Sequence, residues 1–138
     1  MKRGFFVMRD RGSAVIIEGC MVALIQRIVD GSVYYVFPGG GIENGETPEE
    51  ATRREAFEEL GVELKVKERI ATVYFNGTQY YFLSEIINGT FGTGNGEEYT
   101  DKERYAGTHL PIWADINSLS SMDIIPKEVA FEVQSRFK

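Results

Sequence analysis

Three consecutive glycines lead into a strongly capped helix, and this junction limits the folds that the chain can adopt. The glycines occupy positions 39–41, directly after an apolar and aromatic stretch. Thr47 is a favoured N-cap, and Pro48 suits the first position of a helix. Glu50 lies three residues after Thr47 and completes a capping box, while Gly61 supplies a left-handed stop. The pattern predicts a strand, a glycine-rich turn and then a helix that ends before Gly61.

The predicted helix carries its acidic side chains on one side. At about 100° per residue, three glutamates fall within one arc: Glu55, Glu58 and Glu59. The opposite arc, which we expect to pack against a sheet, carries three apolar side chains: Ala56, Phe57 and Leu60. Like charges at these spacings destabilise a helix by roughly 0.2–0.5 kcal/mol per pair, and acids near its C-terminal end oppose the helix dipole.

Two interpretations of this acidic arc are open. It can be a solvated face of an acidic protein, or a site for hard divalent cations such as Mg²⁺ and Mn²⁺, which prefer carboxylate oxygens. The glycines favour the second interpretation, because they permit positive φ and let the backbone approach a ligand or metal closely. An ordinary tight turn needs only one or two glycines.

The rest of the chain reads mainly as strands. They are expected over residues 4–8, 14–28 with a break near Glu18-Gly19, 33–37, 66–75, 78–87 and 110–116. Asp30-Gly31 and Asn76-Gly77 are dipeptides typical of hairpin turns. A second helix is expected over 126–137, and the polar segment 88–109 shows no period. The elements predict one α+β domain over residues 1–138, with helices packed on the faces of a sheet.

The composition is that of an acidic globular protein. Lys and Arg number 15 against 21 Asp and Glu, which gives a formal net charge of −6. This balance argues against nucleic-acid binding through a basic face, so phosphate binding would need a local device or metal ions. No apolar run approaches the roughly 18–20 residues that cross a bilayer, and one cysteine allows no intrachain disulfide. We expect a cytoplasmic protein with no membrane or nucleic-acid partner. We also expect Cys20 to be a small residue of the hydrophobic core.

Residues 40–62 resemble the Nudix box. Gly40, five residues, Glu46, seven residues and then Arg54-Glu55-Ala56-Phe57-Glu58-Glu59-Leu60-Gly61-Val62 match every specified position of that motif. With the strands before the box, the aromatic hairpin after it and the C-terminal helix, nearly the whole chain is similar to a minimal MutT-like Nudix domain. The resemblance implies an α/β/α sandwich with a mixed central sheet. It also implies metal-dependent hydrolysis of a nucleoside diphosphate linked to another moiety.

The same resemblance implies roles for individual residues. Mg²⁺, for which Mn²⁺ can substitute, would be held by carboxylates and a backbone carbonyl: Glu55, Glu58, Glu59 and Gly39 or Gly40. Either Glu55 or Glu58 would also be the base that activates water. Arg54 and Glu46 would complete the catalytic set as an ion pair that fixes the loop against the helix. The backbone of Gly39, Gly40 and Gly41 would contact the substrate.

Many relatives draw a further acid from the loop before the last strand. The candidates here are Glu97, Glu98 and Glu103, of which Glu98 is the predicted additional metal ligand, with solvated loop charges as the alternative. The single histidine, His109, is interpreted as a loop or strand-edge residue rather than a catalyst.

The chain size favours a nucleoside triphosphate as the small-molecule substrate. One or two aromatic residues near the box would stack on its base, and most of the candidates are expected to be core residues: Tyr34, Tyr35, Tyr74, Phe75, Tyr80, Tyr81 and Phe82. The alternative function is a Nudix-fold sensor module that binds a nucleotide without turnover. A homodimer is an open alternative to a monomer, because many small relatives are dimers.

Overall fold

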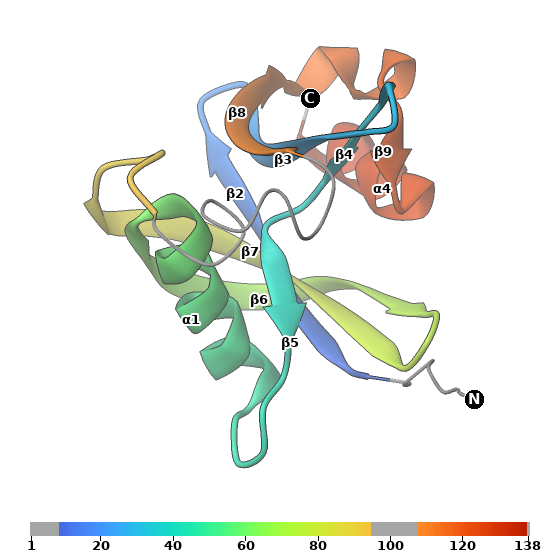
Figure 1. Ribbon diagram of the computed structural model, residues 1–138. Helices are drawn as coiled ribbons and strands as arrows, with labels where there is room; N and C mark the ends of the chain where they lie inside the picture. Colours follow the sequence, from blue (N-terminus) through green and yellow to red (C-terminus); the bar gives the residue numbers. More distant parts are fainter. Residues whose placement is uncertain (1–8, 95–107, 138) are drawn as a thin grey trace.

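The computed structural model describes residues 9–94 and 108–137 of the chain (Figure 1). Its elements follow in this order: β2 (Arg11–Glu18), β3 (Met21–Val29), β4 (Ser32–Val36), β5 (Gly39–Gly41), α1 (Pro48–Leu60), β6 (Val62–Tyr74), β7 (Thr78–Gly89), β8 (Thr108–Asp115), the 3₁₀ helix η1 (Ile116–Ser121), β9 (Ile124–Ile125) and α4 (Lys127–Phe137). The strand expected over residues 4–8 lies outside the described residues.

The strands of the described part of the chain form one mixed sheet. Its order is β6-β7-β2-β3-β4-β9, and β5 pairs with β2 while β8 pairs with β3. β2 runs parallel to β7 and β4 runs parallel to β9, whereas the other pairs are antiparallel. β2 is the central strand, because it pairs with β3, β5 and β7.

Alternation along β2 gives the sheet two apolar faces. Ala14 and Ile16 pack in one core with Leu60 of α1, whereas Val15 packs in a second core with Val133 of α4. Successive side chains of a strand point to opposite faces, so neighbouring residues serve different layers. The two helices accordingly lie on opposite sides of β2 (Figure 1). The predicted α/β/α sandwich with a mixed central sheet is confirmed.

The local signals for turns and caps are confirmed. Thr47 accepts a hydrogen bond from the Glu50 amide at 3.1 Å, and the Glu50 carboxylate accepts one from the Thr47 amide at 2.9 Å. Gly61 ends the helix in the left-handed conformation with φ of 77°. The hairpin turns at Asp30-Gly31 and Asn76-Gly77 both have positive φ at their two residues.

Three short elements were not expected from the sequence. β5, β9 and η1 are 3, 2 and 6 residues long, too short for an apolar period to show. β5 corrects the interpretation of the glycines, since Gly39–Gly41 form a strand paired with β2 and have no positive φ. Their lack of side chains permits close packing against neighbouring side chains.

Two expectations about buried residues were wrong. Cys20 is exposed, because Gly19 adopts a φ of 59° and places the cysteine in the turn between β2 and β3. Phe57 is 59% exposed, although it was assigned to the packing face of the helix. The buried face of α1 is rotated towards its acidic side and includes Thr52 and Glu59 as well as Leu60.

No helix in residues 9–94 or 108–137 is long and apolar enough to span a membrane.

The observed buried face of α1 predicts different losses of stability for two apolar residues of this helix. Leu60→Ala should lower the free energy of unfolding by about 2–5 kcal/mol, because Leu60 is 0% exposed and its removal leaves a cavity. Phe57→Ala should change it by less than about 0.5 kcal/mol, because its side chain faces solvent. Urea denaturation measures both values. Equal losses would show that Phe57 also packs against the sheet.

Candidate active site

The glycines of β5 bring the backbone against the acidic helix. A Cβ at Gly40 would overlap the Glu55 carboxylate, and one at Gly39 would overlap the Ser13 hydroxyl. Both neighbours therefore occupy space that any other residue would fill. This close packing places Glu55 directly beside the β5 backbone.

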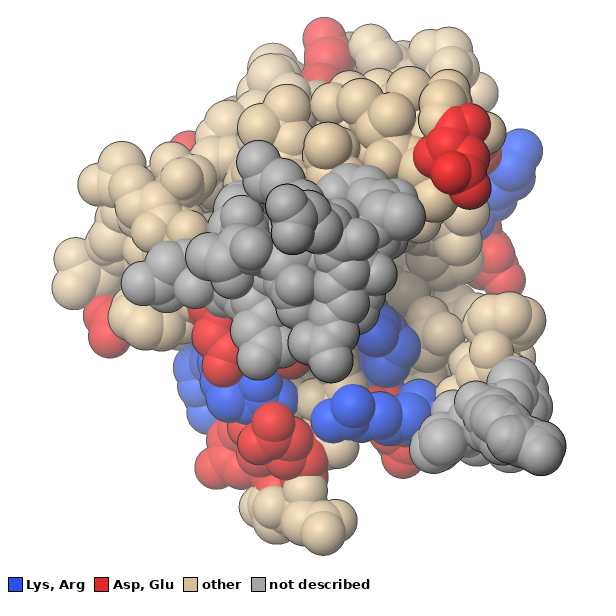
Figure 2. Space-filling model, in the orientation of Figure 1, with Lys and Arg blue, Asp and Glu red and all other residues tan. Residues whose placement is uncertain are grey.

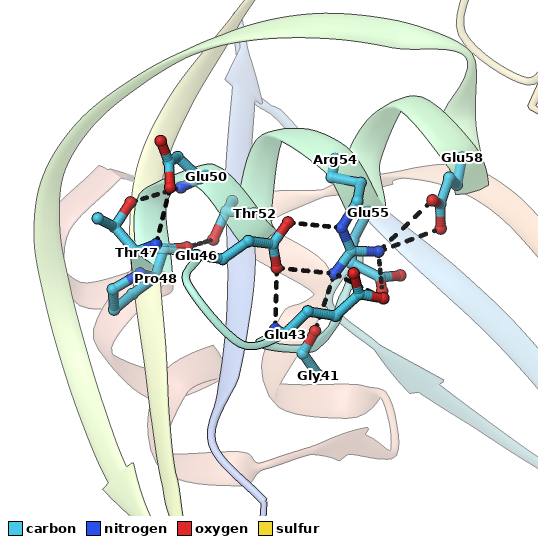
Figure 3. Close-up of polar contacts among 10 residues, drawn as sticks. All are labelled: Gly41, Glu43, Glu46, Thr47, Pro48, Glu50, Thr52, Arg54, Glu55 and Glu58. Carbon is cyan, nitrogen blue, oxygen red and sulfur yellow. Dashed lines mark hydrogen bonds and ion pairs between the residues drawn. The ribbon is translucent and has the colours of Figure 1, made fainter.

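Arg54 joins the helix to the preceding turn and to β5 (Figure 3). Its Nε donates to Glu46 Oε2 at 2.7 Å, and its Nη2 donates to Glu46 Oε1 at 3.1 Å and to the Gly41 carbonyl at 2.9 Å. Glu46 in turn accepts from the Glu43 amide at 2.9 Å, which closes the turn. The predicted ion pair between Arg54 and Glu46 is present, and it is bidentate.

The remaining nitrogen of Arg54 faces two carboxylates of the acidic arc. Nη1 lies 3.0 Å from Glu55 Oε2 and 3.4 Å from both oxygens of Glu58. The Glu55 side chain is mostly buried, with 12% exposed, whereas that of Glu58 is 44% exposed. One cationic group thus lies between two carboxylates that come from successive turns of α1, as Figure 3 shows.

The charge pairing determines how these groups are protonated. Hydrogen bonds from Arg54 and from the Glu43 amide lower the pKa of Glu46 from 4.5 to about 2. The hydrogen bond with Glu46 raises the pKa of Arg54 above its already high ordinary value. Glu46 is therefore anionic and Arg54 cationic at neutral pH.

Glu59, the third glutamate of the arc, has a different environment. It is 7% exposed and accepts a hydrogen bond from the Gly39 amide at 2.9 Å. The structure therefore brings Glu55 and Glu58 together around Arg54, and it places Glu59 beneath β5.

The chemistry of this site fits a hard divalent cation. Glu55 and Glu58 already face a positive charge, and carboxylate oxygens are the ligands that Mg²⁺ and Mn²⁺ prefer. In the described ranges, 9–94 and 108–137, no group of three or more His, Cys, Asp or Glu side chains lies in an arrangement that could hold a metal ion. The ligand set of Glu55, Glu58, Glu59 and a glycine carbonyl stays a prediction.

The other predicted residues have different outcomes. Glu97, Glu98 and Glu103 lie outside the described residues. His109 is on β8, half-buried and opposite Arg27 of β3, so it is a strand residue as interpreted.

The surface around α1 and β5 carries charges of both signs. Figure 2 shows acidic and basic side chains side by side on the lower part of the molecule, where Figure 1, in the same orientation, draws α1 and β5.

A cavity of about 620 Å³ opens on the opposite face of β2, towards α4. The Ser13 side chain lines it, and Ser13 pairs with Gly39 of β5, so the cavity adjoins the glycine strand from the other side. Sequence reasoning missed five polar residues that line it: Arg11, Ser13, Gln79, Lys127 and Glu128. In a strand, the side chains of residues 11 and 13 point to the same face, opposite to that of Gly12. This alternation was the available signal that Arg11 and Ser13 share a surface.

The aromatic candidates divide between the two faces. Tyr74, Phe75 and Tyr81 line the cavity, and the first two are strongly exposed at the β6-β7 hairpin. Tyr80 and Phe82, which stack on each other, point to the other face. Burial raises the pKa of Tyr81 to about 12, so its hydroxyl keeps its proton at neutral pH and can donate.

Comparisons with known proteins identify the family. The sequence model of the NUDIX domain matches residues 5–114, so the chain belongs to the Nudix family. No curated protein matches the chain.

Solved structures share the fold at low sequence identity. A NUDIX hydrolase from Nitrosomonas europaea has a TM-score of 0.71 and 17% identity, over 92% of this chain and 88% of that one. A MutT described for Aliivibrio salmonicida and Vibrio cholerae has a TM-score of 0.64 and 18% identity, over 94% and 98%. An ADP-ribose pyrophosphatase from Streptococcus suis has a TM-score of 0.67 and 12% identity, over 94% and 91%.

The pairing of Glu46 predicts a pH-dependent contribution to stability. The folded pKa of about 2 lies below the ordinary 4.5, so this contribution is present above about pH 4.5 and is lost as the pH falls towards 2. Glu46→Gln should lower the free energy of unfolding at neutral pH, and its difference from wild type should shrink over that acidic range. Urea denaturation at a series of pH values measures the difference.

Glu132→Gln is the control, because Glu132 pairs with Arg136 on an exposed face of α4. It should leave the free energy of unfolding nearly unchanged at every pH. A Glu46→Gln difference that persists undiminished near pH 2 would contradict the assigned pairing.

Proposed function

We propose that this Nudix hydrolase cleaves the phosphoric anhydride of a nucleoside diphosphate linked to another moiety, with a nucleoside triphosphate as the first candidate. One observation carries the proposal: Glu55 and Glu58 converge on a single cationic position next to the glycine strand. That strand adjoins a cavity large enough for an organic group. In this proposal the phosphates would bind on the acidic side of β5, and the rest of the substrate would bind in the cavity on the other side.

A divalent cation is the cofactor of the proposal. Mg²⁺, or Mn²⁺ in its place, would be held by Glu55 and Glu58, with Glu59, a carbonyl of Gly39 and Glu98 as the further predicted ligands. Bound there, it would neutralise phosphate charge and lower the pKa of water. A polyanionic substrate needs this charge, because the chain itself has a net charge of −6.

Side chains of the acidic helix and the turn before it would accept the proton and fix the positions of the catalytic groups. Either Glu55 or Glu58 would accept the proton of the water that attacks phosphorus. Arg54 and Glu46 would hold the helix and the turn in register, so that the base and the β5 backbone keep their relative positions. The backbone of Gly39–Gly41 would approach the phosphates, because no side chains intervene.

The substrate class is supported by a structural relative. The ADP-ribose pyrophosphatase of Streptococcus suis shares the fold, and its name states a nucleoside diphosphate substrate. A nucleoside triphosphate stays the first choice because the chain is short. We place the activity in the cytoplasm, and a homodimer remains the alternative to a monomer.

Turnover should depend on Glu58 without the fold depending on it. Glu58→Gln should reduce kcat about 100-fold or more, because it removes a predicted base and metal ligand. Glu132→Gln is the matched control, since Glu132 also pairs with an arginine one helical turn away. The assay measures released phosphate products with Mg²⁺ or Mn²⁺ against nucleoside triphosphates, ADP-sugars and dinucleoside polyphosphates.

Either outcome of this assay is informative. Full activity of Glu58→Gln at unchanged metal dependence would remove Glu58 from the mechanism. Nucleotide binding by wild type without any turnover would favour the sensor function.

Metal binding should be measurable without substrate. Saturating Mn²⁺ should raise Tm by about 3–10 °C, because a ligand that binds only the folded state stabilises it. The shift should disappear in a Glu55→Gln, Glu58→Gln double variant and persist in Glu132→Gln. An equal shift in the double variant would place the bound metal elsewhere on the protein.

A further inference from the structure

Ser13 has a buried hydroxyl without a hydrogen-bond partner among residues 9–94 and 108–137. Its exposure is 3%, and it is one of four buried polar residues of the described chain. The Thr52 hydroxyl donates to the Pro48 carbonyl at 2.8 Å, and the Ser84 hydroxyl donates to the Phe82 carbonyl at 3.0 Å. Buried polar groups are almost always paired, and an unpaired one lowers stability. Ser13 therefore calls for a functional explanation.

The hydroxyl of Ser13 lies at the wall of the cavity. Ser13 pairs with Tyr81 of β7 on one side and with Gly39 of β5 on the other, and its Oγ occupies the space where a Gly39 side chain would be. Gly39 donates its amide to Glu59. A ligand that touches Ser13 would thus lie one strand away from the acidic helix.

Two other polar side chains that line the cavity, those of Tyr81 and Gln79, bind each other. The Tyr81 hydroxyl donates to Gln79 Oε1 at 2.8 Å, and Gln79 Nε2 donates to the Phe75 carbonyl at 3.1 Å. Because a carbonyl can only accept, this contact fixes which end of the Gln79 amide faces Phe75. The network holds the wall in one arrangement and leaves the Ser13 hydroxyl for a ligand.

We propose that Ser13 is a specificity-determining residue whose hydroxyl hydrogen-bonds a polar edge atom of the substrate's nucleobase inside this cavity. The proposal rests on the proposed function. Phosphates would occupy the acidic side of β5, so the organic group would extend to the other side. The exposed rings of Tyr74 and Phe75 at the cavity favour a flat aromatic group, because bases stack on such rings.

Two identical substitutions on neighbouring strands test the proposal. Ser13→Ala should leave the free energy of unfolding unchanged or raise it, because it removes an unpaired buried hydroxyl. It should also raise KM about 3- to 10-fold with little change in kcat, as expected for the loss of one hydrogen bond to substrate. Ser84→Ala should do the opposite: it should lower stability and leave KM unchanged, because it breaks the bond to Phe82.

Binding without catalysis separates this proposal from the proposed function. Calorimetric titration in the presence of Mg²⁺ would compare AMP, GMP, CMP and UMP, which have no anhydride to hydrolyse, with inorganic pyrophosphate. Ser13→Ala should weaken binding of at least one nucleotide by a similar factor and leave that of pyrophosphate unchanged. If wild type hydrolyses nothing while Ser13→Ala still weakens nucleotide binding, the proposed function fails and the role of Ser13 stands.

Three results would overturn the role of Ser13. The first is a Ser13→Ala variant whose KM and nucleotide affinity equal those of wild type, whatever its activity. The second is a loss of stability in Ser13→Ala equal to that in Ser84→Ala, with unchanged KM, which would show a structural hydroxyl. The third is the absence of nucleotide binding to wild type, which together with the absence of hydrolysis would overturn both proposals.

Discussion

The bidentate ion pair between Arg54 and Glu46 is the contact on which the rest of the site depends. It joins a residue in the middle of α1 to the turn before that helix, and the same guanidinium holds the Gly41 carbonyl of β5. Because Arg54 is held on that side, its remaining nitrogen faces Glu55 and Glu58 in a defined position. The arrangement offsets the repulsion between two acids on successive turns and keeps both beside the glycine strand.

The central strand connects this acidic helix with the cavity behind it. Gly12 faces α1, where an added side chain would meet the Pro48 carbonyl and Thr52, whereas Ser13 faces the cavity. Two consecutive residues of β2 therefore contribute to two different parts of one proposed site. Gly39 links them, because it pairs with Ser13 and donates its amide to Glu59. A substrate that extends around β5 would contact both sides.

Much of the fold could be predicted because its signals are local. The capping box at Thr47 and the stop at Gly61 depend on residues within one or two turns, and both are present. The packing face of α1 could not be predicted from hydrophobicity alone. Glu59 is buried because the Gly39 amide pairs with it, while Phe57 remains exposed. A buried carboxylate with a distant partner leaves no periodic signal in the sequence.

The family, the helix that carries the acidic residues and the pairing of Arg54 with Glu46 follow from the residue order, because the motif specifies residue types at fixed spacing. The three-dimensional packing sets which glutamates face each other, how the glycines are used and where the cavity lies. These depend on contacts between residues far apart in the chain, such as Ser13 with Gly39 and Tyr81. The Ser13 hydroxyl is unpaired among residues 9–94 and 108–137, and this depends on how the neighbouring strands are arranged in space, so no pattern in the sequence indicates it.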